Sequence, residues 1–363
     1  MIWRAVRRAI LYVYMNKFCV VGAAITALFV IASCGSNNTN VFDAPVIFSK
    51  PHEVCAIEGK KVAFSDYKPI GIVSLYVEDS ILLVKASDPK TSPFQIHAFS
   101  LKDFSDKGHF VAKGRGENEM LKPIIRGSVN GWQDGVYLFD LGLCSSYCLD
   151  LTKSMEMQKT NLRQISKLPA RTIDAYPMGN HQLAFVLEKD DYACVELDME
   201  GNRVSSIPLY PEVSGNQYFD RLSSACALNL ERQKLAMAML MLPQLNMLDV
   251  STGRRKTFAV SKEYRDWEKM LKSDDDARWM HYISVAQSSE CIMALYGGCS
   301  LLDWLTSAVL PHLHIFDWNG NFLYDVSLKE NLNAIAFDES NGRLLGVDKD
   351  DEIFEYDLSG LKL

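Results

Sequence analysis

Histidine is scarce in this sequence, and the familiar catalytic motifs are absent. Only seven histidines occur among 363 residues, and His312 and His314 form the only close pair. The sequence has no G-x-S-x-G turn, no H-E-x-x-H helix and no phosphate-binding P-loop. The enzyme classes that these motifs define are therefore not indicated, and the sequence favours a protein that is not an enzyme.

An excess of basic residues is also lacking. Lysine and arginine number 38 against 45 acidic residues, for a net charge of −7. Residues 1–33 hold four basic residues and no acidic one, so a chain that begins at residue 34 has a net charge of about −11. Nucleic-acid binding needs a basic surface, so a nucleic acid is not an expected partner. No apolar run after residue 33 is long enough to span a bilayer.

The apolar run that is present lies at the amino terminus. Residues 18–33 carry no charge, Lys17 precedes them, and three arginines lie upstream. A basic start, a short apolar stretch and small residues at its end are typical of a secretory signal peptide, which we place at residues 1–33. Translation from Met15 would give a compact signal peptide, whereas residues 1–14 could also form a long basic start, and both alternatives stay open.

The signal peptide ends at Ser33, directly before Cys34. The residues Ile31-Ala32-Ser33-Cys34 resemble the lipobox of bacterial lipoproteins. The resemblance implies that the Cys34 thiol is lipidated, that the chain is cleaved before it, and that the new amino terminus is acylated. Residues 34–42 would then be a short flexible tether. The alternative is an ordinary signal peptide or signal anchor with an incidental cysteine.

Beyond residue 42, short β-rich runs alternate with turns of Asp, Asn, Gly and Ser. Asn319-Gly320 is a typical tight hairpin turn. The runs recur in groups of four with a period of about 40–50 residues, which predicts a β-propeller. Residues 43–363 accommodate six blades, and the last group is one strand short. Residues 53–66 can supply that strand and close the ring, and an array of β-sandwiches is the main alternative.

The last strands, in HIFDWNGNFLYDVSL, AIAFDESNGRLLGV and EIFEYDL, resemble the TolB-like six-bladed propeller lipoproteins of Bacteroidales-type bacteria. Residues 95–123 resemble an early blade of that family, but Glu117-Asn118 stands where Pro-Gly is common. The resemblance implies an anchored six-bladed propeller and supplies no catalytic residues. Surface-exported lipoproteins of such bacteria often carry acidic residues just after the lipidated cysteine. None occurs here before Asp43, so the periplasmic side of the outer membrane is favoured over the cell surface.

Seven cysteines remain after residue 34, and seven cannot all pair within one chain. Most are expected to be buried free thiols that behave as small hydrophobic side chains. Cys144 and Cys148 are the candidates for a disulfide at the end of a hairpin. No spacing of ligands indicates a zinc site.

No other cluster predicts a metal or a cofactor. Strand alternation places His312 and His314 on one face without an evident third ligand. The acidic runs at residues 274–276 and 348–352 lack the ligand spacing of an EF-hand, and the second is expected to be a solvated hairpin turn. Gly114-Arg115-Gly116 could offer amide groups to an anion, but a connection between blades is the expected role.

Two insertions interrupt the repeats, at residues 261–280 and 297–313. The first has helical spacing of apolar residues, and the second is rich in leucine and tryptophan. Either they pack on each other and cap the ring, or they form a partner-docking or lid surface. The candidate surface residues are Tyr264, Trp267, Met270, Leu301, Leu302, Trp304 and Leu305.

Together these features favour a non-catalytic binding or assembly module, tethered to the outer membrane, that contacts an envelope protein or glycan through one face. The first alternative is a hydrolase or lyase with a metal in the central channel, held by residues from different blades that spacing cannot identify. The second is a structural envelope protein without a ligand. The propeller fold by itself does not select among them.

Overall fold

The computed structural model describes residues 40–87, 92–129, 135–188, 192–211, 213, 221–273 and 278–363. All of these belong to the unit Asn40–Leu363. The predicted signal peptide, Cys34 and the acidic run at residues 274–276 lie outside the described residues. Val41 and Phe42, which we expected in the tether, are fully buried, so the packed chain begins by residue 41 at the latest.

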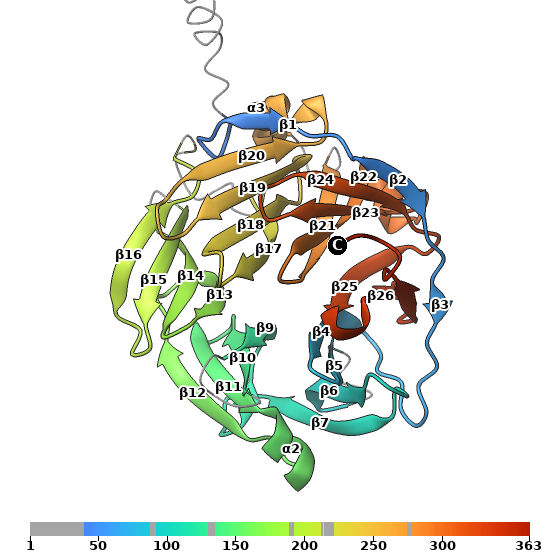
Figure 1. Ribbon diagram of the computed structural model, residues 1–363. Coiled ribbons are helices and arrows are strands. Elements are labelled where there is room, and N and C mark those ends of the chain that lie inside the picture. Colours follow the sequence, from blue (N-terminus) through green and yellow to red (C-terminus); the bar gives the residue numbers. More distant parts are fainter. Residues whose placement is uncertain are drawn as a thin grey trace, which may run out of the picture. The chain divides into compact units, whose positions relative to one another are not determined.

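The described residues form six sheets around a central axis, and the all-β six-bladed propeller prediction is confirmed (Figure 1). Blade one contains β4 (Ile72–Glu78), β5 (Ile81–Ala86), β6 (Phe94–Ser100), β7 (Asp106–Lys113) and β8 (Glu119–Met120). Blade two contains β9 (Pro123–Ser128), β10 (Gly135–Asp140), β11 (Ser145–Asp150) and β12 (Leu162–Lys167). Blade three contains β13 (Thr172–Met178), β14 (His181–Leu187), β15 (Tyr192–Asp198) and β16 (Arg203–Pro208).

The C-terminal half of the chain builds the other three blades. Blade four contains β17 (Ser224–Asn229), β18 (Lys234–Met239), β19 (Gln244–Asp249) and β20 (Arg255–Ala259). Blade five contains β21 (Trp279–Gln287), β22 (Cys291–Ser300), β23 (His312–Asp317) and β24 (Phe322–Ser327). Blade six contains β25 (Leu332–Asp338), β26 (Arg343–Asp348) and β27 (Ile353–Asp357).

The N-terminal segment runs along the outside of the last three blades (Figure 1). Strand β1 (Val46–Phe48) pairs in parallel with β20, and β2 (Glu53–Ala56) pairs in parallel with β24. Strand β3 (Lys60–Lys61) pairs antiparallel with β27 and is the fourth strand of blade six. The sequence did not indicate β1, and β2 extends blade five although it lies within the stretch expected to extend blade six.

Apolar clusters fill the interfaces between neighbouring blades. Each of the six clusters of buried residues draws on two adjacent blades. One of them joins Leu75 and Leu82 of blade one to Leu345 and Val347 of blade six. The first and last blades therefore pack together through the same kind of apolar interface as the others.

The hairpins on the outer side of blades three and five share one loop design. In each, the strand ends in an Asp whose carboxylate accepts the amide N–H of the Asn four residues later, in Asp198–Asn202 and Asp317–Asn321. Gly320 of the predicted Asn319-Gly320 turn has φ +87°, and a Cβ atom there would lie 2.1 Å from the ring of Phe258. Glycine is thus required by the turn and by the packing of blade five on blade four.

Short helices occur only between strands of the described chain. They are α2 (Leu151–Met157), η2 (Lys262–Asp266), α3 (Trp267–Lys272), α4 (Leu301–Leu305) and η4 (Glu339–Asn341). No helix among the described residues is long and apolar enough to cross a membrane. The helix predicted within residues 261–280 is confirmed by η2 and α3.

Candidate functional site

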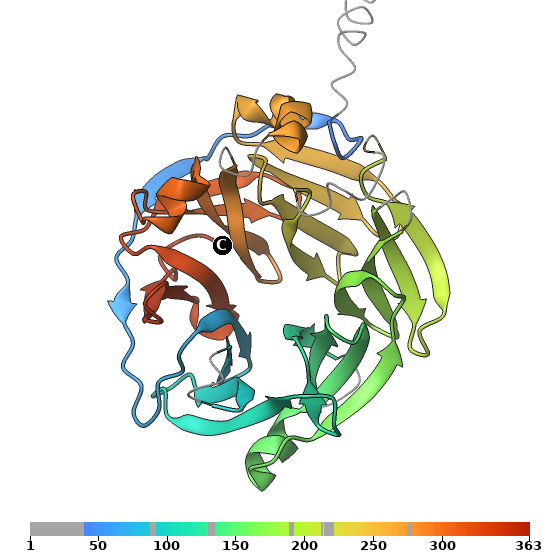
Figure 2. The same ribbon diagram turned by 180° about the vertical axis from the view of Figure 1, so that it is seen from behind.

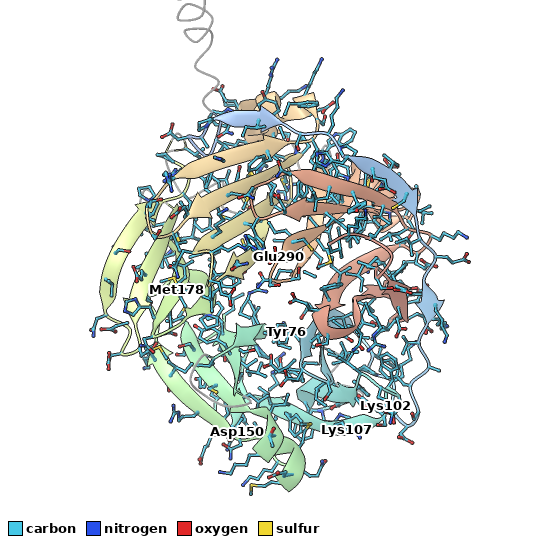
Figure 3. The ribbon with its side chains drawn as sticks, viewed as in Figure 1. Tyr76, Lys102, Lys107, Asp150, Met178 and Glu290 are labelled. Atoms are coloured by element: carbon cyan, nitrogen blue, oxygen red, sulfur yellow. The ribbon has the colours of Figure 1, made fainter. Side chains whose placement is uncertain are left out.

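The innermost strands of all six blades surround a central channel. Its cavity has a volume of about 550 Å³ and is lined by residues of β4, β9, β13, β17, β21 and β25. Tyr76 of β4 marks the channel in Figure 3. A cavity of this size is typical of a site for a small ligand or a protruding chain segment.

Irregular pairing shapes the channel wall. The register between the innermost strand and its neighbour shifts in blades one, two, three, five and six. Such β-bulges bend a strand and re-aim its side chains, and they are common beside functional sites. The bulge before Asp174 in β13 lies beside the most highly charged contact of the channel.

That contact joins Arg126, Asp174 and Tyr176. The guanidinium of Arg126 donates two hydrogen bonds to the Asp174 carboxylate, at 2.7 and 2.9 Å, and lies 5.2 Å from the centre of the Tyr176 ring. The Tyr176 hydroxyl donates to the same carboxylate at 3.0 Å. Burial alone would lower the pKa of Arg126, but Asp174 outweighs it and raises that pKa. Burial raises the pKa of Tyr176, so the Arg126 guanidinium is charged and the phenol is neutral at pH 7.

Carboxylates gather at one end of the channel. Those that line it are Glu78, Asp79, Glu231, Asp338 and Glu339. The Ser128 hydroxyl lies 2.7 and 2.8 Å from the two carboxylate oxygens of Glu78, and the Ser289 amide donates to Glu339 at 3.0 Å. All five lie in or beside the loops that join the first and second strands of their blades, so this end of the channel is acidic.

A polar groove continues from this end of the channel between blades six and one. Its volume is about 720 Å³, and it shares Asp79 and Ser340 with the channel. Arg343 crosses the floor: it donates to the buried Asp338 at 2.7 Å, to Glu355 at 2.8 Å and to the Leu101 carbonyl of blade one at 3.2 Å. The strongest charges of the groove are therefore already paired.

The predicted histidine pair lies on one face of β23, as strand alternation required. His312 Nδ1 lies 2.6 Å from Asp325 Oδ1, and His314 Nε2 lies 3.8 Å from the same atom. The hydrogen bond to Asp325 raises the pKa of His312, whereas burial lowers the pKa of His314 to about 3. Asp325, on the neighbouring strand, was not evident from the sequence. No three His, Cys, Asp or Glu side chains converge on a metal position anywhere in the described part of the chain.

The candidate partner residues divide into buried and exposed groups. Tyr264 is buried, and Trp267 and Met270 pack against the cluster between blades three and four. Tyr264 therefore holds the first insertion on the ring, whereas Trp267 and Met270 are half-buried, and their role in a partner surface stays a prediction.

The second insertion is different. Trp304 is buried against Gly297, whereas Leu302 is 66% and Leu305 is 67% exposed, and Leu301 is half-buried. The helices α3 and α4 both lie on the side of the ring that faces the reader in Figure 2. The candidate partner surface is therefore reduced to the exposed side of α4.

The described cysteines are all free thiols, including Cys144 and Cys148. Cys148 lies in β11 and Cys144 directly precedes that strand, so about 13 Å of extended chain separates their Cα atoms. A disulfide needs less than about 7 Å, and the bond considered from the sequence is not formed.

The remaining turn predictions concern two loops. The loop at residues 348–352 is a hairpin turn in which Asp348 accepts the amides of Asp350 and Glu352. At residues 114–116, the Gly116 amide donates a hydrogen bond to the Glu119 carboxylate. The amide group that could have bound an external anion is therefore occupied by a side chain of the protein itself.

The channel residues were missed because each comes from a different blade. Arg126 and Asp174 are 48 positions apart in the sequence, and only folding brings them together. One signal was present: Asp174 and Tyr176 are polar residues two apart in an otherwise apolar strand, which places both on one face.

No protein-family model matches this chain, and no curated protein matches it either. Two solved structures share its fold. The first, from Bacteroides fragilis and described as an exported protein, is 12% identical with a TM-score of 0.56, and the match covers 86% of this chain and 98% of that one. The second, a member of the DUF4221 family from Bacteroides vulgatus, is 8% identical with a TM-score of 0.54, and the match covers 84% and 97%. This likeness shows the fold alone, and membership of the TolB-like family remains a prediction.

Proposed function

We propose that this protein is an exported propeller, lipidated at Cys34 and tethered to the periplasmic side of the outer membrane, that binds an envelope protein or glycan without catalysing a reaction. The apolar run before Cys34 and the lipobox resemblance support the anchor. The Bacteroides fragilis structure with the same fold is described as an exported protein, which supports export but does not bear on the lipid. In this proposal β3 closes the ring by completing blade six.

One observation carries the binding role: the channel offers space, and the arginine that lines it is already paired. Arg126 of the channel is paired with Asp174, and Arg343 of the neighbouring groove is paired with Asp338 and Glu355. General acid–base chemistry needs a titratable group that is free to exchange a proton with a substrate. A cavity of about 550 Å³ with a paired arginine in its wall and an acidic end suits recognition of a partner.

The acidic end of the channel points away from the insertions. Successive antiparallel strands alternate in direction, so the loops with Asp79, Glu231 and Glu339 lie at one end of the blades. The connections with α3 and α4 lie at the other end. The partner would therefore reach the channel from the side opposite the insertions.

A photo-cross-linking residue at Gln287 tests this proposal in intact cells of the producing bacterium. Gln287 lines the channel and is exposed. We expect it to form one recurrent cross-linked product, which mass spectrometry would identify as a protein or a glycan. The control carries the same residue at Val204, which is 53% exposed on the outer strand β16 of blade three and should give no such product. Absence of a product at Gln287 would contradict a channel ligand.

The anchor is tested by labelling cells with a palmitate analogue. Wild-type protein is expected to take up the label, and Cys34→Ala is expected to lose it, because the thiol that carries the lipid is removed. A Cys55→Ala variant is the matched control, since Cys55 lies in β2 of the propeller and should have no effect on labelling. Equal labelling of wild type and Cys34→Ala would show that Cys34 is not the lipidated residue.

A further inference from the structure

The helix α4 presents an apolar side to solvent. Leu302 and Leu305 are three residues apart, so they lie on the same face of the helix, and about two-thirds of each side chain is exposed. Trp304 is buried, and the Ser300 hydroxyl accepts the Asp303 amide at the start of the helix. The exposed leucines are thus held on a short, capped element whose other side is fixed in the propeller.

Further apolar residues extend this surface. Trp279 at the start of β21 is 52% exposed, and it pairs with Ser300 directly before α4. Val309 and Leu310, which lead back to β23, are 37% and 45% exposed. We name the set Trp279, Leu302, Leu305, Val309 and Leu310 the apolar edge. A monomeric protein rarely exposes so many large apolar side chains together without a contact to make.

The beginning of the packed chain shares an apolar cluster with the insertion that precedes this edge. Val41 and Phe42 are buried in the same cluster as Leu271 of α3. The insertion that contains α3 ends at Arg278, whose carbonyl accepts the amide of Leu301, the first residue of α4. The first insertion therefore has described residues in the cluster that holds the start of the packed chain and also against the first residue of α4.

The length of the tether limits how far this end can lie from the lipid. Five residues separate Cys34 from Asn40, and a fully extended chain of six steps spans only about 20 Å. If Cys34 carries acyl chains, Asn40 stays within that distance of the bilayer surface. A protein partner placed between this side and the membrane would have little room.

We propose that the apolar edge rests in the interfacial layer of the bilayer to which Cys34 is anchored. This inference depends on the lipid anchor of the proposed function and adds an orientation. Tryptophan and leucine side chains are favoured at this depth, tryptophan at the headgroup level and leucine at the acyl boundary. The acidic end of the channel then faces away from the membrane, towards its partner.

Quenching of tryptophan emission by brominated lipid tests the orientation. The lipidated protein, purified from the producing bacterium, is reconstituted into vesicles of phosphatidylethanolamine and phosphatidylglycerol with plain or brominated acyl chains. We expect brominated vesicles to reduce the emission. Most of this reduction should disappear in Trp279→Phe, which removes the reporter, and in Leu302→Ser/Leu305→Ser, which removes the apolar contact. Val204→Ser, an exposed apolar residue on blade three, should keep the reduction.

Flotation of the same vesicles separates the two proposals. Protein that floats with the vesicles but shows equal emission in both lipids would overturn the orientation and leave the anchor intact. If a cross-linker at Leu305 then captures a recurrent envelope protein in cells, the apolar edge is a protein-docking surface instead. Protein that does not float would contradict the anchor, and the orientation with it.

Discussion

Lowering the pH from 7 to 5 is expected to reduce the free energy of unfolding by about 2 kcal/mol for each of three buried histidines. Burial lowers the pKa of His97 and His281 to about 4 and that of His314 to about 3. Their side chains are almost fully removed from solvent. Each histidine is therefore neutral in the folded protein over this range but gains a proton when the chain unfolds.

The sign follows from which state binds more protons. Below the ordinary histidine pKa of about 6.5, these histidines bind protons in the unfolded chain but stay neutral in the folded protein. The free energy of unfolding therefore falls as the pH falls. One pH unit corresponds to about 1.4 kcal/mol per group, which gives about 2 kcal/mol between pH 6.5 and 5. His312 acts in the opposite direction, because its raised pKa adds stability at low pH, and it offsets part of the loss.

The surroundings explain why these histidines stay neutral. His97 Nδ1 lies 2.8 Å from Nδ1 of His109, so one of these nitrogens carries a proton and the other accepts it. If both nitrogens carried a proton, this hydrogen bond would be lost. Burial is the main cause of the lowered pKa of His97, and the neighbouring His109 adds to it. His281 stacks against Trp279 and Tyr296, and burial among these aromatic rings lowers its pKa.

Urea unfolding at pH 7, 6 and 5 measures the effect, and His281→Phe isolates one group. Phenylalanine preserves stacking with the two aromatic neighbours and loses one hydrogen bond, to the Tyr296 hydroxyl. The variant is expected to be less stable than wild type at pH 7 but to lose about 2 kcal/mol less on going to pH 5. His52→Gln, a change at an exposed histidine, should keep the wild-type dependence. An unchanged dependence in His281→Phe would show that this imidazole is protonated in the folded state.

Much of the fold could be predicted because propeller strands carry their signal locally. In blades three to six, apolar alternation and Asp/Asn/Gly turns identified nearly every strand that the structure contains. Strand β9 was missed because Pro123 begins it and Arg126-Gly127 interrupts its apolar pattern. Strands β1 and β2 were not assigned to blades four and five, because a three- or four-residue edge strand depends on a partner about 210 or 270 residues away.

The candidate site was much less predictable, because its residues come from different blades. Only the closed arrangement of the blades brings them together. The sequence showed that Tyr264 and Leu305 belong to insertions, but not that the first is buried and the second exposed. That difference depends on which insertion lies over the cluster between blades three and four. The same holds for Asp325, which completes the histidine pair from the neighbouring strand.

The ion pair in the channel gives the second large effect: Asp174→Asn is expected to lower the free energy of unfolding by about 2–3 kcal/mol. The substitution leaves the Arg126 guanidinium in the channel wall without its counter-charge. The expected cost is at the low end for a broken buried pair because 30% of the Arg126 side chain remains exposed. Arg126→Met should cost less, since the carboxylate keeps the hydrogen bonds from the Tyr176 hydroxyl and the Ala175 amide.

A double-mutant cycle of Asp174→Asn and Arg126→Met measures how much the interaction between the two side chains contributes to the free energy of unfolding. The variant with both changes should be more stable than the sum of the single effects predicts, by about 1–2 kcal/mol, because neither charge is then left alone. The pair Lys329–Glu58, with 61% and 70% exposure, is the matched control, and Glu58→Gln should change stability by less than about 0.5 kcal/mol. Additive effects in the cycle would mean that water already screens Arg126 from Asp174. The channel would then hold a free charge, and the argument for recognition over proton transfer would lose its main support.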